Sequence, residues 1–358
     1  MTTNETAKVP PKISIIVPAR NEESCLGACL ESLTAQTGVP FEVIVVDDHS
    51  TDRTREIAAS FSGIRVLQAR PLPEGWTGKN NAVTTGALAA LGEWLLFTDA
   101  DTVHLPGSLA RSLEEARKKS AALLSYSPEQ VVKGFWEKAV MPVIFAELAS
   151  YYRPSEVSDP RSPAAAANGQ YLLITREAYD AVGGHAAVST SLLEDVSLAR
   201  AVKQSGRKIL FRYGGDAVRT RMYRSFSQLR EGWTKNLALL FPWPGWLAAW
   251  RGLEFLLVTA CLAFMVVAIS RRDYLHAILY AVLPVFTFLR IRRAHFSWAA
   301  TALSLLGLPL FSYLLLRSKM AYGRGDVSWK GRTYPGAGQD VPSTSRKQES
   351  NGLSHAQS

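Results

Sequence analysis

The sequence predicts a doubly wound α/β domain followed by membrane helices. Over residues 13–126, short apolar runs alternate with helical stretches, as in a sheet that carries helices on both faces. Longer apolar runs follow after residue 252, and Arg271, Arg272 and Arg290 flank them. A soluble core does not favour this placement of arginines, so the C-terminal part of the chain is predicted to associate with a membrane.

Five apolar runs in the first half are nearly continuous, as in strands that are buried on both faces of a parallel sheet. The predicted strands are Ile13–Val17, Phe41–Asp47, Ile64–Ala69, Glu93–Thr98 and Ala121–Tyr126. The stretches between them predict the helices Glu22–Gln36, Thr51–Ser60, Lys79–Leu91 and Pro106–Ser120. Ligands of such folds bind beyond the carboxyl ends of the strands.

The middle of the chain is less regular. Residues 134–152 are mostly apolar but contain Glu137, Lys138 and Glu147, which fits either an amphipathic helix at a membrane interface or a core helix. Residues 153–166 are rich in Pro, Ser and Ala and are predicted to form a loop, and residues 167–233 return to mixed α/β patterning.

Three apolar runs approach the ~17–25 residues that cross a bilayer. They are Leu253–Ile269, Tyr274–Leu289 and Trp298–Leu316. Three crossings would place the basic tail opposite the α/β domain, whereas positively charged segments favour the cytoplasmic side. Either one run is therefore re-entrant, or Leu237–Trp250 contributes a partial crossing. The expected location is the cell inner membrane, multi-pass, with the α/β domain in the cytoplasm.

The charge of the chain is concentrated at its C-terminal end. From Trp250 onward there are 13 Lys or Arg and five Asp or Glu, a net +8, so residues 1–249 carry only +1 of the total +9. Because this excess lies beside apolar runs, it indicates membrane flanking, and we expect no nucleic-acid partner. Residues 1–12 are polar and lack the apolar core of a signal peptide. The tail, residues 318–358, is basic and is expected to be disordered.

Two carboxylates follow the predicted strand Glu93–Thr98. Side chains alternate along a strand, so Asp99 and Asp101 are expected to point to the same side. Carboxylate oxygens placed in this way suit Mg²⁺ or Mn²⁺, which can in turn hold a diphosphate. The alternative is a solvated strand end that carries two aspartates by chance.

The first predicted strand leads into Pro18-Ala19-Arg20-Asn21-Glu22, and the chain has no G-x-G-x-x-G motif. A bound nucleotide must therefore be held by side chains. Asp48 could accept a hydrogen bond from a base imide, and Arg20 could lie against a base or a phosphate. The alternative for Asp47 and Asp48 is a helix-capping turn.

Two further segments contain candidate residues. Asp195 precedes a predicted helix, Val196–Gln204, and could act as a general base, although carboxylates are also favoured at a helix start for structural reasons. Arg230 and Trp233 provide a cation and an indole that could meet a diphosphate and an acceptor chain, or could instead form a membrane-interface belt. His185 follows two glycines and is more often structural in such a loop.

Taken in order, the motifs at Pro18–Glu22, Val46–Asp52, Asp99–Asp101 and Glu194–Asp195 resemble those of family 2 glycosyltransferases. The resemblance covers residues 12–235 and implies an inverting enzyme with a GT-A fold, a mixed sheet with a Rossmann-like nucleotide-binding half. The GT-A domain is accordingly expected at residues 13–235 and the membrane region at 236–317. The resemblance also implies roles for individual residues. The nucleotide site would be lined by Pro18, Ala19, Arg20 and Glu22, with Asp48 in contact with the uracil. Asp99 and Asp101 would serve the metal-bound diphosphate, with Asp101 favoured as the direct metal ligand, and Asp195 would be the general base.

Two short motifs narrow the resemblance. Trp76–Asn80, which contains Lys79, and Trp329–Tyr334 are similar to segments of a membrane-anchored bacterial subgroup that glycosylates carotenoids and other lipids. Lys79 is assigned to the donor site on this basis. Processive members carry Q-x-x-R-W, but here the spacing is Gln228-x-Arg230-x-x-Trp233, which argues against a polymerase.

The expected reaction moves a sugar from a nucleotide sugar, UDP-sugar above all, to a hydroxyl or carboxyl of a lipid or polyprenyl-type acceptor. One in-line displacement inverts the anomeric centre, and Asp195 removes the acceptor proton. The alternatives are synthesis of a polysaccharide or cell-envelope glycan, and a non-catalytic membrane scaffold. A pyrophosphorylase would need a Gly-rich loop after the first strand, and Val17–Glu22 does not provide one.

Overall fold

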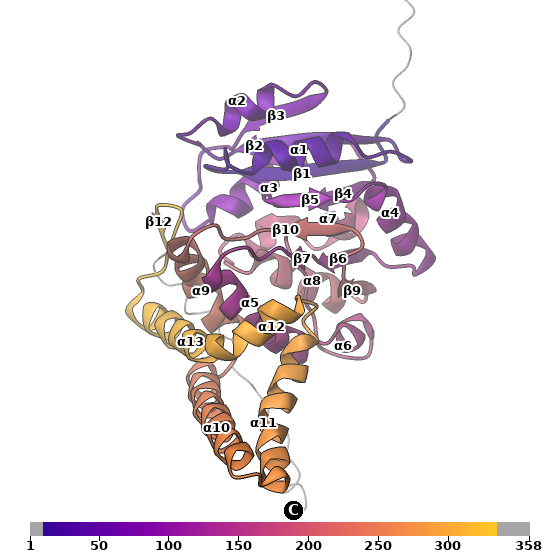
Figure 1. The fold of residues 1–358 in the computed structure, drawn as a ribbon. Helices are drawn as coiled ribbons and strands as arrows, with labels where there is room; N and C mark the ends of the chain where they lie inside the picture. The colour runs from indigo at the N-terminus through magenta and orange to yellow at the C-terminus, as the bar shows by residue number, and fades with distance from the viewer. Residues whose placement is uncertain (1–9, 335–358) are drawn as a thin grey trace, which may run out of the picture.

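The computed structural model describes residues 10–334 (Figure 1). Within them, the main sheet has seven strands in the order β3-β2-β1-β4-β8-β6-β9. The strands are β1 (Ile13–Ala19), β2 (Phe41–Asp47), β3 (Ile64–Gln68), β4 (Trp94–Phe97), β6 (Leu123–Ser127), β8 (Leu172–Thr175) and β9 (Ile209–Tyr213). β8 is antiparallel to both of its neighbours and the other pairs are parallel. The prediction of a mixed sheet of the GT-A type is confirmed.

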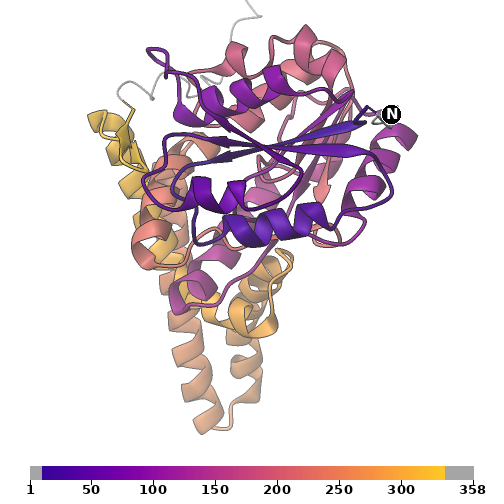
Figure 2. The same ribbon diagram turned by 90° about the horizontal axis from the view of Figure 1, so that it is seen from above.

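Helices cover both faces of this sheet (Figure 2). α1 (Leu26–Thr34), α2 (Thr54–Ala59) and α4 (Ser108–Lys118) pack on one face, whereas α3 (Gly78–Ala89), α7 (Arg176–Ala181) and α8 (Glu194–Gln204) pack on the other. The alternation of β1 explains the two cores, because Ile15 and Val17 face the first helix layer and Ile16 faces the second.

The predicted strands agree with the structure to within two residues at each end, but the four helices predicted over residues 22–120 are too long. α8 instead begins at Glu194, two residues earlier than predicted, so Asp195 lies in its first turn rather than before it. α1 begins at Leu26 rather than Glu22, and the segment before it is held by side chains of the loop after β2 and of the first residue of α2. The N–H of Asn21 donates to Ser50, and the N–H of Glu22 donates to Thr54. These hydrogen bonds connect the segment after β1 with the segment after β2.

The domain also contains several shorter elements. β5 (Thr102–His104), β10 (Val218–Thr220) and β7 (Glu129–Gln130) form a small second sheet, and η1 (Gly184–Val188) precedes α8. α6 (Pro154–Ser158) lies within the predicted loop 153–166, which is therefore not wholly irregular.

Residues 134–152, for which two interpretations were open, form the core helix α5 (Phe135–Tyr151). Val140, Val143 and Ile144 are fully buried in a third apolar core, which also contains residues of α9 (Phe226–Leu240) and of the C-terminal helices. Because α9 runs through residue 235, the predicted domain limit falls inside a helix.

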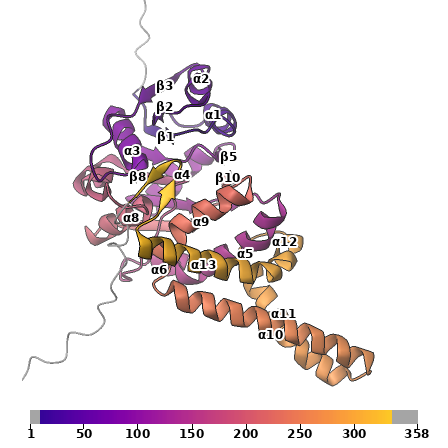
Figure 3. The same ribbon diagram turned by 90° about the vertical axis from the view of Figure 1, so that its left-hand side faces the viewer.

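Within residues 10–334, three helical segments are long and apolar enough to cross a membrane. α10 (Pro244–Ser270) and α11 (Tyr274–Arg292) form a hairpin that projects from the rest of the molecule (Figures 1 and 3). The third segment consists of α12 (Trp298–Leu303), η2 (Ser304–Leu306) and α13 (Gly307–Arg324). In the most apolar 18 residues of this third segment, 44% of the residues are buried inside the protein, whereas the corresponding stretches of α10 and α11 are 11% and 22% buried. The third segment is more buried because α13 packs on α5, α9 and α10.

Gly307 marks the closest approach of the third segment to the domain. A Cβ built at this position would lie 1.8 Å from the carbonyl oxygen of Ala139 in α5. Only glycine therefore lets α13 start against the backbone of α5.

A buried ion-pair cluster joins the projecting hairpin to the domain. Glu147 of α5 pairs with Arg251 of α10, with 2.9 Å between Nε and Oε1, and with Arg290 of α11. Glu254 pairs with the same two arginines and accepts a hydrogen bond from Thr287 at 2.9 Å. Two carboxylates and two guanidiniums thus balance one another at the base of the hairpin.

After α13 the chain returns to the α/β domain. β11 (Ser328–Trp329) and β12 (Arg332–Thr333) form a small hairpin with Lys330 and Gly331 in its turn (Figure 3). Residues 318–334 are therefore ordered, which corrects the expectation of disorder for this part of the tail. The remainder of the tail lies outside the described residues.

Candidate active site

A cavity of about 720 Å³ lies at the carboxyl ends of β1, β2 and β4. Its lining includes most of the residues that the sequence singled out: Pro18, Ala19, Arg20, Glu22, Asp48, Lys79, Asp99, Asp101, Asp195 and Trp233. The parallel strands that bring these segments to one edge thus place them in a single cavity.

Asp99 and Asp101 lie in a turn and not on a strand. β4 ends at Phe97, and the chain turns so that the N–H of Thr102 donates to the carbonyl of Asp99 at 3.2 Å. The strand alternation used in the sequence argument therefore does not apply here. The turn itself brings both carboxylates into the cavity lining.

Asp101 has the properties of a ligand for a hard cation. Its Oδ1 is buried and has no hydrogen-bond partner among the described residues. Burial, together with the carboxylates of Asp99 and Glu22, raises the pKa of Asp101 to about 7, and Lys330 opposes this rise. A divalent cation would supply the positive charge that this carboxylate lacks.

The described residues contain no group of three or more metal-ligating side chains. Two carboxylates nevertheless fit Mg²⁺ or Mn²⁺, because Mg²⁺ is usually held by one or two carboxylates, with water and substrate phosphates in the remaining positions. Asp101 would hold the metal directly, with Asp99 beside it.

Lys79 connects two parts of the cavity. Its Nζ lies 2.7 Å from Asp99 and 2.7 Å from Glu194. Burial alone would lower the pKa of Lys79, but the two carboxylates outweigh it and raise this pKa well above its usual value. The start of α3 is thereby joined to the start of α8 and to the Asp99 turn.

Asp195 is held by two backbone groups. The N–H of Gly169 donates to Oδ2 at 2.8 Å, and the N–H of Val196 donates to Oδ1 at 2.8 Å. Burial and the neighbouring Glu194 raise the pKa of Asp195 to about 6, although these bonds and Lys79 oppose the rise. A carboxylate with this pKa is ionised at neutral pH and is more basic than an exposed aspartate, as a general base requires.

Asp47 and Asp48 have different roles. The carboxylate of Asp47 accepts a hydrogen bond from the N–H of Ser50 at 3.2 Å and so holds the turn after β2. The N-cap residue of α2 is Arg53, without a side-chain cap hydrogen bond, so neither Asp47 nor Asp48 caps this helix. The carboxylate of Asp48 instead faces the cavity, where Arg20 donates to its carbonyl oxygen at 2.7 Å.

The family model described as Glycosyl transferase family 2 matches residues 14–195, the part of the chain that carries these carboxylates. The chain belongs to glycosyl transferase family 2. It is a glycosyltransferase, and the family uses nucleotide sugars.

This glycosyltransferase is similar to 4,4'-diaponeurosporenoate glycosyltransferase of Staphylococcus aureus (strain USA300), with 29% identity over 341 residues, which cover 90% of this chain and 88% of the relative. Similar solved structures include the mannosyltransferase PcManGT from Pyrobaculum calidifontis in complex with GDP-Man and Mn²⁺, with 18% identity, coverage of 88% of this chain and 87% of that chain, and a TM-score of 0.49. Another is glucosyl-3-phosphoglycerate synthase from Mycobacterium tuberculosis in complex with Mn²⁺, UDP and phosphoglyceric acid, with 21% identity, coverage of 64% and 78%, and a TM-score of 0.41.

Part of the lining of the glycosyltransferase's cavity is apolar. Residues in or directly after α5, in α9 and in the connection after α11 contribute to it: Phe145, Leu148, Tyr152, Leu240 and Phe296. Trp233 is buried beside them, and its Nε1–H points to the sulfur of Met141 at 3.4 Å. Arg230 is not part of the lining; its guanidinium lies over the ring of Phe226 at 6.0 Å.

His185 belongs to the packing of the domain. It is buried, contacts the ring of Phe97 edge-on and shares a hydrogen bond of 3.1 Å with the hydroxyl of Tyr179. Burial lowers its pKa to about 4, so it is neutral at pH 7. These contacts agree with the structural interpretation of this residue.

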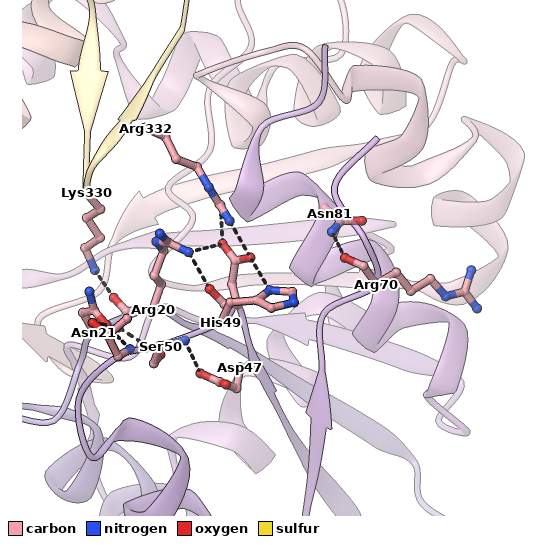
Figure 4. Close-up of polar contacts among 11 residues, drawn as sticks. Arg20, Asn21, Asp47, His49, Ser50, Arg70, Asn81, Lys330 and Arg332 are labelled. Carbon is pink, nitrogen blue, oxygen red and sulfur yellow. Dashed lines mark hydrogen bonds and ion pairs between the residues drawn. The ribbon is translucent and has the colours of Figure 1, made fainter. Parts of the chain in front are cut away.

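Two lining residues that sequence reasoning did not place are Lys330 and Arg332. The motif Trp329–Tyr334 was visible in the sequence, but it lies more than 280 residues from its partners, so only the fold shows where it goes. Figure 4 shows both side chains pointing from the C-terminal hairpin toward Arg20 and its neighbours.

Proposed function

We propose that this glycosyltransferase moves a sugar from a UDP-sugar to the hydroxyl or carboxyl of a lipid acceptor at the membrane, with inversion at the anomeric carbon. The observation that carries this proposal is the composition of the cavity. It has a polar part that carboxylates and cations line, and an apolar part to which α5, α9 and the connection after α11 contribute, and α9 leads into the helices that could cross a membrane.

The donor would occupy the polar part. Asp48 is placed to accept the imide N–H of a uracil, Arg20 lies beside it, and Pro18, Ala19 and Glu22 form the adjoining wall. Mg²⁺ or Mn²⁺ held by Asp101 would offset the charge of the leaving diphosphate. Lys79 would act there both as a cation near the phosphates and as the group that fixes Asp99 and Glu194.

The acceptor would enter from the apolar part, with its polar group near Asp195. The acceptor oxygen forms a bond to the anomeric carbon as the bond from that carbon to the diphosphate breaks. Asp195 takes the proton of a hydroxyl acceptor. A carboxylate acceptor is already ionised at pH 7 and needs no base. The relative named for diaponeurosporenoate supports an apolar acceptor that bears a carboxylate.

The helix arrangement supports two membrane crossings. α10 and α11 would cross as a hairpin, since the 19 residues of α11 rise ~28 Å, close to the thickness of a bilayer core. The segment α12–α13 would stay on the domain side, because it packs on α5 and α9 and leads back to the cavity.

Charge supports the orientation. The tip of the hairpin has Arg271 and Arg272, whereas its base and α13 carry more cations: Arg290, Arg292, Arg293, Arg317, Lys319 and Arg324. The positive-inside rule then places the catalytic domain in the cytoplasm at the cell inner membrane. Re-entrance of the third apolar run, one of the two arrangements left open by the sequence, is thus the one we adopt.

The test uses the full chain in lipid nanodiscs with UDP-glucose, UDP-GlcNAc and GDP-mannose. A bacterial lipid extract and a set of water-soluble sugars serve as separate acceptors, with Asp101→Ala as the inactive control. We expect release of UDP together with a glycolipid that the control does not form. Transfer to the soluble sugars alone, or the growth of an oligosaccharide, would overturn the proposal.

A further inference from the structure

The C-terminal hairpin reaches the wall of the donor site. Arg332 forms a two-point ion pair with Asp48, in which Nη1 contacts Oδ2 and Nη2 lies 2.9 Å from Oδ1. Lys330 pairs with Glu22, and its Nζ also donates to the carbonyl of Arg20 at 3.1 Å. Both partners belong to the wall proposed to hold the nucleotide.

The chain makes room for this contact at Gly78. The φ of Gly78 is not positive, so its backbone does not call for glycine. A Cβ at this position would, however, lie 1.6 Å from Nη1 of Arg332 and 2.7 Å from Oδ2 of Asp48. Any other residue at this position would push the guanidinium away from the carboxylate.

α9 anchors the hairpin from the other side. The N–H of Lys330 donates to Glu231 at 3.2 Å, and Nζ of Lys235 lies 5.3 Å from the ring centre of Trp329. The turn at Lys330 and Gly331 has positive φ at both residues, 46° and 76°, as a tight two-residue hairpin turn requires. One cation, Lys330, lies in the turn and the other, Arg332, directly follows it, so α9 holds the hairpin while both cations line the cavity.

The charge of the cavity explains the need for these cations. Seven carboxylates line it: Glu22, Asp48, Asp99, Asp101, Glu194, Asp195 and Glu231. Seven Lys or Arg side chains balance them, and the hairpin supplies two. A diphosphate that enters adds further negative charge, and Lys79 is already shared between two carboxylates. The cations of the hairpin pair instead with Asp48 and Glu22 of the proposed nucleotide wall, so a nucleotide that engages this wall could release them to its diphosphate.

Resting on the proposed function, we infer that the hairpin β11–β12 is part of the donor site and that its two cations exchange partners. In the empty site Arg332 and Lys330 neutralise Asp48 and Glu22. When the donor is bound, Asp48 accepts the base, and the two cations bind the diphosphate. The hairpin then closes over the nucleotide, which makes Lys330 and Arg332 residues that recognise phosphate rather than base.

The experiment compares the binding of UDP with that of uridine, and of GDP with guanosine, to the full chain in nanodiscs by calorimetry. We expect Arg332→Ala and Lys330→Ala each to weaken diphosphate binding about tenfold or more, in the range of a lost charge-assisted contact. Nucleoside affinity should stay the same or rise, because Asp48 is freed. Retained nucleoside binding also shows that the variant is folded.

Arg324→Ala is the matched control. It removes an exposed cation at the end of α13, a few residues before the hairpin, that does not line the cavity. Hydrogen exchange of residues 326–334 gives a second measurement, and we expect slower exchange when UDP is added. Equal loss of nucleoside and diphosphate binding, no change in either, or faster exchange would overturn the inference. A wild-type chain that binds neither diphosphate would overturn the proposed function as well.

Discussion

Gly169 donates its backbone N–H to Oδ2 of Asp195 at 2.8 Å and so fixes the orientation of the residue that we propose as the base. A Cβ at Gly169 would lie 2.9 Å from Nζ of Lys79 and 3.7 Å from Oδ2 of Asp195. The loop before β8 therefore passes directly beside the charged groups of Lys79 and Asp195.

Asp195→Asn should retain donor binding and lose most of the transfer to a hydroxyl acceptor, because general-base assistance is typically worth ~10²–10⁴-fold. The measurement is single-turnover transfer together with UDP affinity. With a carboxylate acceptor the loss should be much smaller. An unfolded variant that no longer binds UDP would instead identify Asp195 as a structural residue of α8.

The pH dependence follows from the same carboxylate. Its pKa is raised to about 6, so the basic form predominates above pH 6 and becomes protonated below it. The rate of transfer to a hydroxyl acceptor should therefore fall about tenfold per pH unit well below pH 6. The rate of the Asp195→Asn variant should not show this decrease at low pH. If the decrease persists in the variant, another titrating group causes it.

Asp101→Ala should abolish transfer, and EDTA should silence the wild type until Mg²⁺ or Mn²⁺ is restored. The reason is that Oδ1 of Asp101 is buried without a partner, ready for a cation. Asp99→Asn should cost less, since Asp99 is already paired with Lys79. Direct metal binding, measured with Mn²⁺ by electron paramagnetic resonance in the presence of UDP, provides a readout besides activity. Full activity in EDTA would contradict the metal hypothesis.

Much of the nucleotide half could be predicted from the sequence, because strands buried on both faces and polar residues at their ends are local signals. The pattern placed Arg20, Asp48 and Asp101 at one edge, and the structure brings them into one cavity. The contact between Arg332 and Asp48 could not be predicted in this way, since it depends on how α13 returns the chain to the domain.

Helix ends and membrane helices were harder to predict for physical reasons. The N–H groups of Asn21 and Glu22 bond to Ser50 and Thr54, about 30 residues away in the sequence, and a local pattern does not show such contacts. The run Trp298–Leu316 has the composition of a membrane span, yet its apolar side chains can be buried by protein helices as well as by lipid. Gly307 marks this packing at its closest point, and its role appears only beside Ala139.

Gly307→Ala should lower the stability of the membrane-inserted protein, because its Cβ would overlap the carbonyl of Ala139 and force α13 away from α5. Overpacking of this kind typically costs about 1–3 kcal/mol. Gly323→Ala in the same helix is the control, since nothing lies within 4 Å of its added Cβ. The thermal midpoint in detergent should fall only for the first variant. Equal midpoints would show that α13 is not held at this contact.

Glu147→Ala should also be destabilising, since it leaves Arg251 and Arg290 with one shared carboxylate in place of two. Removing one partner of a buried pair typically costs ~3–5 kcal/mol. Glu114→Ala, an exposed glutamate on α4, serves as the control. A midpoint as high as that of the control would mean that water, rather than Glu147, solvates these arginines.

The number of membrane crossings decides whether the hairpin β11–β12 can reach the donor site. In a chain whose native cysteines are replaced by alanine, single cysteines are placed at Arg271, Glu56 and Asp326, which are all exposed. With two crossings, a membrane-impermeant maleimide added to intact spheroplasts should label only the cysteine at position 271. The other two should be labelled only in inverted vesicles. Labelling of positions 326 and 56 from opposite faces would require a third crossing, and the ion pair between Arg332 and Asp48 could then not form in the membrane.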